Sequence, residues 1–215
     1  ANRIAYNCDG VNVSTTDGRR FRAKRAISTL SIGVLQHTHA TLFDPPLPAD
    51  QQHLLDAGGI VMGNLTKVFV QFPKVFWDND LVRFLVADSD GDEDESGLFC
   101  EWQNLNHPSV LPGSQTLMLI LGDPQSSYFE GQPDAVVQAA VMRRARQMFP
   151  ADTVPEPSAL YISRHGYDPL SYGAYSGWLP GWRDAWYSRL VRPLQACRAP
   201  RVYFAGEGMC DNLAG

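Results

Sequence analysis

The chain has 215 residues, of which 44% are hydrophobic and 19% are charged, and its formal net charge at pH 7 is −5. This is the balance of an ordinary globular protein, with enough residues for one large domain or two small ones. The negative charge argues against nucleic acid as the main partner, because phosphate binding needs a basic face. No apolar stretch approaches the length of a membrane-spanning helix, so we predict no membrane span.

The N-terminal part of the sequence predicts short strands. The pairs Asp9-Gly10 and Asp17-Gly18 are typical of the turns in β-hairpins. The run IGVLQ at 32–36 is expected to end this block of strands. A proline-marked loop and a short helix ended by glycines are expected at 44–59.

The clearest predicted strand lies in NLTKVFVQFPKVFW. Val68 and Val70 alternate with Lys67 and Phe69, so the two pairs should face opposite sides of a sheet. Further strands are expected in LVRFLVA, LFCEWQNL, QTLMLILG, SALYISRHG and, near the C-terminus, RVYF.

The strongest predicted helix is PDAVVQAAVMRRARQMF, with Pro133 at its start and an apolar stripe of Val137, Val141 and Ala145. RDAWYSRLVRPL predicts a second helix, and DPLSYGAYSGWLPG before it predicts a long loop. Strands and helices do not alternate strictly, as they would in an all-parallel sheet. The sequence therefore predicts an α/β fold of the α+β type.

No metal site is predicted. His37 and His39 would lie on one side of an extended segment, but two ligands leave a zinc site incomplete. The acidic loop at 88–95 has the alternate spacing of a calcium-binding loop. Glu93, however, occupies the position where such a loop needs glycine for its sharp turn.

Two residues stand out as candidates for chemistry. Glu207 directly follows the closing strand, where open α/β sheets bind ligands, and its carboxylate can accept hydrogen bonds from sugar or ribityl hydroxyls. It could equally be an acid that caps a turn. Lys67 lies on a half-buried strand face, where a lysine is either held for chemistry or reaches solvent from an edge. Gly206-x-Gly208 fails as a phosphate-binding turn, because Asp211 stands at the third glycine position.

Five stretches occur in an order that resembles the C-terminal half of the flavin-containing amine oxidases, most closely the polyamine oxidase branch. They are DGRRFRAKRAISTLSIGVLQ, PPLP, GNLTKVFVQFPKVFW, DPLSYGAYSGWLPG and RVYFAGEGMCDNLAG. The resemblance implies FAD as cofactor. It also implies oxidation of a C–N bond of a polyamine-like amine to an imine, with O2 reduced to hydrogen peroxide.

The same resemblance implies a domain organisation. Residues 1–36 and 196–215 would be parts of an FAD-binding, Rossmann-like domain and should pack side by side. Residues 37–195 would form a substrate-binding domain with a mixed β-sheet flanked by helices. We therefore expect the chain to be the C-terminal part of a longer protein, inactive by itself.

The resemblance also implies roles for single residues. Lys67 matches a lysine that holds a water near the flavin N5 and is our catalytic candidate. Tyr175 matches one wall of an aromatic cage that grips the amine. Glu207 matches the acid that contacts the ribityl chain. Further cofactor-binding candidates are Gly206, Gly33 and Val34.

Two positions depart from the family pattern. His165 stands where an aromatic residue, usually Trp, precedes the DP loop, and we count it as a substrate-binding candidate. Leu213 replaces a common Tyr. These changes leave alternatives open: a non-catalytic truncated domain, or an L-amino-acid oxidase that binds a carboxylate through Arg164 or Arg183. A histone-demethylase relative is disfavoured because no helical hairpin is inserted. The sequence predicts neither compartment nor oligomeric state.

Overall fold

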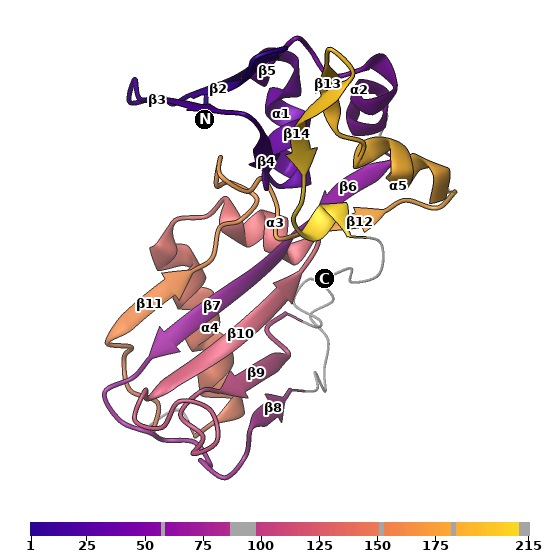
Figure 1. Ribbon diagram of the computed structural model, residues 1–215. Helices are drawn as coiled ribbons and strands as arrows, with labels where there is room; N and C mark the ends of the chain where they lie inside the picture. Colours follow the sequence, from indigo (N-terminus) through magenta and orange to yellow (C-terminus); the bar gives the residue numbers. More distant parts are fainter. Residues whose placement is uncertain (57–58, 87–97, 151–152, 182–183, 211–215) are drawn as a thin grey trace. The chain divides into compact units, whose positions relative to one another are not determined.

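The chain folds into two compact units, which are described separately. The computed structural model describes residues 1–56, 59–86, 98–150, 153–181 and 184–210 (Figure 1). Unit 1 comprises Ala1–Gly63 and Asp168–Gly215, and unit 2 comprises Asn64–Tyr167. These limits differ from the expected domain limits at 36/37 and 195/196. The assignment of those segments to cofactor and substrate domains stays a prediction.

A sheet of antiparallel hairpins forms one part of unit 1. Its strands are β1 (Arg3–Asn7), β2 (Gly10–Ser14), β3 (Arg20–Ala23) and β5 (Phe43–Asp44), in the order β3-β2-β1-β5. Both predicted hairpin turns are confirmed, since Asn7 pairs with Gly10 and Ser14 with Arg20. Ile4, Tyr6 and Val11 supply the buried face of the sheet. Burial, reinforced by the nearby Asp44 carboxylate, raises the pKa of Tyr6.

The two ends of the chain share a second sheet of unit 1. It contains β4 (Ala26–Ser28), β13 (Leu194–Ala196) and β14 (Ala199–Phe204), with β14 parallel to β4. A disulfide between Cys8 and Cys197, which lie 189 residues apart in the sequence, also links the N-terminal and C-terminal segments. The expected side-by-side packing of these segments is confirmed.

The run IGVLQ begins a helix, so its prediction as the end of a strand block is wrong. Helix α1 (Ile32–Leu42) starts after Ser31, whose Oγ accepts a hydrogen bond from the backbone N–H of Val34 at 3.1 Å. A short apolar run has the same periodicity in a buried strand and in a buried helix. The serine before it is a favoured N-cap residue and would have indicated the helix.

The remaining elements of unit 1 enclose its core. They are α2 (Ala49–Asp56), α5 (Asp184–Leu190), β6 (Ile60–Gly63), β12 (Tyr175–Trp178) and the short 3-10 helix η1 (Glu207–Met209). The prediction of a continuous loop at 168–181 is wrong, because β12 pairs antiparallel with β6. Glycine and serine weaken the local strand signal there, and the partner strand lies more than 100 residues away in sequence.

Unit 2 is built on one sheet. Its strands are β7 (Leu65–Gln71), β8 (Arg83–Leu85), β9 (Glu101–Asn104), β10 (Thr116–Gly122) and β11 (Ala159–Ile162), in the order β11-β7-β10-β9-β8. Every pairing among these described strands is antiparallel, so the expected mixed pairing is not found in this sheet. The segment that connects β10 to β11 carries two helices and places β7 between these strands.

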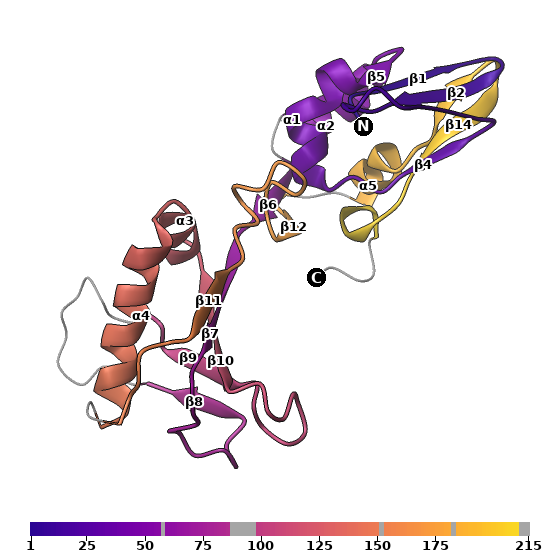
Figure 2. The same cartoon turned by 90° about the vertical axis from the view of Figure 1, so that its left-hand side faces the viewer.

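Those helices, α3 (Gln125–Glu130) and α4 (Asp134–Met148), lie on one side of the sheet (Figure 2). Val137, Val141 and Ala145 of α4 are fully buried and share a core with Val68 and Val70 of β7. Lys67 points to the other side and is exposed. The helix, its apolar stripe and the two faces of the strand are therefore confirmed, as is the α/β fold class.

The described helices include none that is both long enough and apolar enough to cross a membrane.

Candidate active site

The ends of two parallel strands bring the cofactor-binding candidates of unit 1 together. Strand β4 leads into the N-terminus of α1, which carries Gly33 and Val34, and β14 leads into Gly206 and Glu207. The backbone N–H of Ala205 donates to the carbonyl oxygen of Ser28 at 2.9 Å and joins the two connections. A ligand site at the carboxyl ends of parallel strands is the general rule for open α/β sheets.

Glu207 is held in this position by Ser176. Its Oε1 accepts hydrogen bonds from the backbone N–H and the Oγ of Ser176, both at 3.0 Å, and its Oε2 lies 3.2 Å from the same N–H. A carboxylate has about four acceptor positions. The exposed Glu207 therefore keeps capacity for the hydroxyls of a ligand.

Tyr175, the candidate for substrate binding, is the residue before Ser176. A Cβ placed on Gly63 would lie 2.7 Å from the Tyr175 Cζ, so the ring lies directly over this glycine of β6. Tyr175 is 42% exposed. One short strand, β12, thus presents both the aromatic ring and the serine that orients Glu207.

The first turn of α1 is fixed by residues that the sequence did not single out. Ser31 Oγ donates to the carbonyl oxygen of Ser171 at 2.6 Å. The Tyr172 ring stacks on His37, with ring centroids 3.9 Å apart. A Cβ on Gly33 would lie 2.5 Å from the Tyr172 carbonyl oxygen. Gly33 is therefore required for helix–loop packing, independently of any cofactor.

Unit 2 contains the other two candidates, Lys67 and His165. The backbone N–H of Lys67 donates to Ser163 Oγ at 2.7 Å, and the N–H of Ser163 donates to the Lys67 carbonyl oxygen at 2.9 Å. His165 lies two residues further on, in an exposed turn after β11 rather than in the strand. The structure thus brings the backbones of the Lys67 strand and the His165 turn together.

A buried carboxylate supports that turn. Glu130 is 3% exposed; its Oε1 accepts a hydrogen bond from Thr66 Oγ1 at 2.9 Å, and its Oε2 accepts one from the Gly166 N–H at 2.8 Å. Thr66 Oγ1 is also 2.7 Å from Ser126 Oγ. The sequence gave no sign of this network, because its members lie far apart along the chain.

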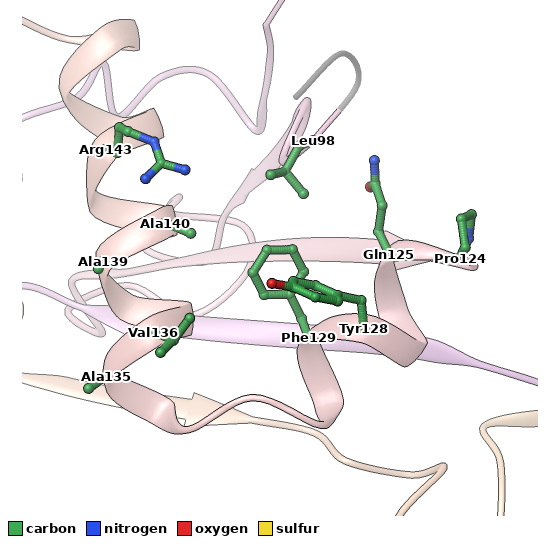
Figure 3. Close-up of a pocket in the computed structure, with 10 residues that line it drawn as sticks. All are labelled: Leu98, Pro124, Gln125, Tyr128, Phe129, Ala135, Val136, Ala139, Ala140 and Arg143. Atoms are coloured by element: carbon green, nitrogen blue, oxygen red, sulfur yellow. The ribbon is translucent and has the colours of Figure 1, made fainter. Parts of the chain in front are cut away.

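One cavity of unit 2 is lined by other residues. It has a volume of about 730 Å³ and lies beside α3 and α4, with the Tyr128 and Phe129 rings on one side and Arg143 at one end (Figure 3). None of its lining residues is a sequence candidate. Its walls are mostly apolar and contain no carboxylate and no histidine.

The histidines considered for a metal are engaged otherwise. His37 and His39 would share a side only in an extended segment. They lie in helix α1, where residues two apart point to different sides. His37 Nδ1 is 2.8 Å from the Gly33 carbonyl oxygen, and His39 Nε2 is 2.8 Å from Asp56 Oδ1. The acidic loop at 88–95, Arg183 and Leu213 lie outside the described residues.

The model of the flavin containing amine oxidoreductase family matches residues 2–215. The chain belongs to this family. The predicted cofactor, FAD, is thereby confirmed, together with the family resemblance.

Curated members of the amine oxidoreductase family include close matches in plants. Polyamine oxidase 6 of Oryza sativa subsp. japonica is 31% identical over 214 residues, which are 99% of this chain and 40% of the relative. Lysine-specific histone demethylase 1 homolog 3 of Arabidopsis thaliana is 32% identical over 202 residues, covering 94% of this chain and 12% of the relative. The chain therefore spans well under half the length of these relatives.

Solved structures of amine oxidases share the fold. A putrescine oxidase bound to putrescine matches with a TM-score of 0.68 at 18% identity, over 97% of this chain and 42% of the solved one. Cyclohexylamine oxidase from Brevibacterium oxydans IH-35A matches with a TM-score of 0.67 at 18% identity, over the same shares.

The residues present fit one part of the cofactor. The Glu207 carboxylate has acceptor capacity for ribityl hydroxyls. Gly206 has φ +115°, and a Cβ there would have no neighbour nearer than 3.7 Å, so bare backbone is open to a ligand. The described residues contain no glycine-rich turn between a strand and a helix to bind the FAD phosphates.

One test concerns the packing at the start of α1. We expect Gly33→Ala to lower the free energy of unfolding by about 1–3 kcal/mol, because the new methyl group meets backbone oxygen atoms that cannot rotate away. Gly122→Ala is the control, since a Cβ there meets nothing within 4 Å. Urea denaturation measures both variants. Equal stability of the two would contradict this account of Gly33.

Proposed function

We propose that the chain is part of an FAD-dependent amine oxidase. The enzyme oxidises a C–N bond of a polyamine-like amine to an imine, and O2 is reduced to hydrogen peroxide. The observation that carries the proposal is the contact between Ser176 of β12 and Glu207 after β14. It joins the strand that carries an exposed tyrosine to the acid at a ligand-binding edge.

Each candidate has a role in this proposal. Glu207 accepts hydrogen bonds from the ribityl chain, while Gly206, Gly33 and Val34 form the backbone close to it. Tyr175 presents its electron-rich ring to the amine. The ring stabilises the protonated amine and orients the lone pair of the neutral amine. Lys67 orients a water or relays a proton. Bound flavin supplies the acceptor for the hydride of the substrate.

Polyamines are the favoured substrates for two reasons. Plant relatives of the chain include proteins named polyamine oxidases, and the exposed Tyr175 suits a flexible cation. An L-amino-acid substrate is less well supported. Arg164 donates to the backbone carbonyl oxygen of Glu130 and forms an ion pair with Asp134, so it is already engaged within unit 2.

A second candidate function is the removal of a methyl group from a lysine side chain of another protein. It is favoured by the 32% identity to a histone demethylase homolog of Arabidopsis thaliana. The same C–N bond chemistry would then act on a methylated side chain. His165 is placed in an exposed turn and is our candidate for distinguishing the two substrate classes.

Hydrogen peroxide release by the full-length protein tests the proposal. The panel contains spermine, spermidine, putrescine, a set of L-amino acids and a peptide with monomethylated lysine. We expect peroxide with at least one polyamine and none with L-amino acids. Peroxide from the methyl-lysine peptide alone would favour the second candidate, and peroxide from none of these amines would contradict both.

We expect residues 1–215, produced alone, not to retain FAD. The Glu207 region contacts only the ribityl part, whereas the phosphates need amide groups at a glycine-rich turn. The measurement is the visible absorption spectrum of the purified chain, with phenol-extracted flavin quantified against protein. A stoichiometric yellow complex would contradict this expectation.

A further inference from the structure

Strand β3 forms a free edge of unit 1. It is the outermost strand in the order β3-β2-β1-β5, and all four of its residues are exposed. The hairpin of β2 and β3 extends from the rest of unit 1 (Figure 1). An exposed edge strand is a template on which another strand can pair.

The backbone of β3 has hydrogen-bonding groups that point away from β2. At the start of the hairpin the N–H of Thr15 donates to the Arg19 carbonyl oxygen at 3.0 Å. Antiparallel pairs alternate, so Phe21 and Ala23 direct their backbone groups toward β2, whereas Arg20 and Arg22 direct theirs outward. Among the described residues, nothing bonds to these outward groups.

The side chains of Arg20 and Arg22 lie on the same face as their cross-strand partners. Ser14 is opposite Arg20, and Asn12 is opposite Arg22. Together with Arg3 they line a shallow hollow of about 340 Å³. The face is therefore polar and basic, although the chain as a whole carries a net charge of −5.

The charges of this face are only partly neutralised within the chain. Arg3, on this face, pairs with Asp44; Arg19 lies on the opposite face, over the Phe21 ring, and pairs with Asp17 at the hairpin turn. Hydrogen bonds from Thr15 and from the Arg19 backbone lower the pKa of Asp17, which keeps that partner ionised. In the described part of the chain, Arg20 and Arg22 have no carboxylate partner.

We propose that β3 binds an extended acidic segment of another protein as an added antiparallel strand. Residues two apart on a strand are separated by about 7 Å, and a partner strand has the same repeat. Acidic side chains at alternate positions would thus lie directly opposite Arg20 and Arg22, and each guanidinium matches a carboxylate in geometry. Phe21, 52% exposed on the other face, contacts the intervening apolar residue.

Backbone pairing favours a peptide over nucleic acid at this edge. Main-chain hydrogen bonds supply affinity when a strand is added to a sheet, and alternate side chains supply specificity. Positive charges on an edge strand also repel basic strands and disfavour the pairing of apolar strands, so they select for an acidic strand. This inference is independent of the proposed oxidase activity.

Fluorescence anisotropy with a labelled peptide, Thr-Glu-Val-Glu-Val-Glu-Thr, tests the proposal on the full-length protein. We expect saturable binding that is lost when the glutamate nitrogens are methylated, because those N–H groups bond to Arg20 and Arg22. Methylation of the valine nitrogens, which point away, should change affinity less than about threefold. Equal loss with both methylation patterns would overturn strand addition.

Charge reversal supplies the second arm. Arg20→Glu/Arg22→Glu should weaken binding of the glutamate peptide at least about tenfold. The variant should instead bind a peptide in which lysine replaces each glutamate, and that binding would also show that the hairpin is folded. The matched control is Lys74→Glu/Arg143→Glu in unit 2, which should leave affinity unchanged. Unchanged affinity in the Arg20/Arg22 variant, or tighter binding of a single-stranded oligonucleotide than of the peptide, would overturn the proposal.

Discussion

Replacing Lys67 with methionine in the full-length protein should lower the rate of flavin reduction or of flavin reoxidation about 100-fold, the loss typical of removing a positioned proton-transfer group. Methionine keeps the apolar stem and a similar volume, so the fold and FAD content should stay intact. The two hydrogen bonds between Lys67 and Ser163 use only the backbone of Lys67, so they remain in the variant. Stopped-flow measurement of each half-reaction is the readout.

The control is Lys74→Met, which changes another exposed lysine of unit 2. It should leave both half-reactions unchanged. If Lys67 merely reaches solvent from a strand face, its variant will behave in the same way as the control. Unchanged rates in both half-reactions would remove Lys67 from the active site.

Replacing Glu130 with alanine should lower the free energy of unfolding of unit 2 by about 3 kcal/mol or more. The carboxylate is buried and accepts hydrogen bonds from Thr66 Oγ1 and the Gly166 N–H. Its loss removes the acceptor of the Gly166 N–H, leaves Thr66 Oγ1 with Ser126 Oγ as its remaining partner, and also creates a cavity. The turn that carries His165 would lose its anchor as well.

Urea denaturation followed by tryptophan fluorescence measures this effect, because Trp77 and Trp102 are buried in the core of unit 2. Glu156→Ala is the matched control: Glu156 is exposed and pairs with Arg146 at the surface, so its loss should cost less than about 1 kcal/mol. Glu130→Gln keeps the side-chain volume, so its loss of unfolding free energy should lie between those of Glu130→Ala and Glu156→Ala. An alanine variant as stable as the control would refute the anchoring role of Glu130.

Regular patterns made much of the fold predictable from sequence. The alternation around Lys67 predicted strand β7 and its two faces, because one face of the strand packs on helices and the other does not. The stripe of Val137, Val141 and Ala145 predicted α4 for the same reason. The hairpin at Asp17-Gly18 followed from turn residues that tolerate the required backbone geometry.

Elements stabilised by distant partners were not predictable in this way. IGVLQ has no periodicity that separates a strand from a helix, and only the Ser31 cap indicates which one forms. Strand β12 exists because β6 pairs with it, and the Cys8–Cys197 disulfide joins residues 189 apart. Neither feature has a local signal.

The candidate site was predictable only in part. Position after a strand indicated Glu207, and resemblance to the family indicated Tyr175 and Lys67. The contacts of Ser176 with Glu207 and of Thr66 with Glu130 were missed, because serine and threonine are common and their partners lie 31 and 64 residues away. Side-chain hydrogen bonds over such separations become visible only in the folded chain.

The most direct test of the proposed amine oxidase is anaerobic reduction of its flavin. The full-length protein, purified with its cofactor, is mixed with spermine, spermidine or putrescine in the absence of O2, and the visible flavin absorption is recorded. We predict a flavin bound in about equimolar amount, bleached by at least one of these amines and restored with release of hydrogen peroxide when O2 is admitted. A full-length protein that binds no flavin, or whose flavin stays oxidised with every amine, would contradict the account.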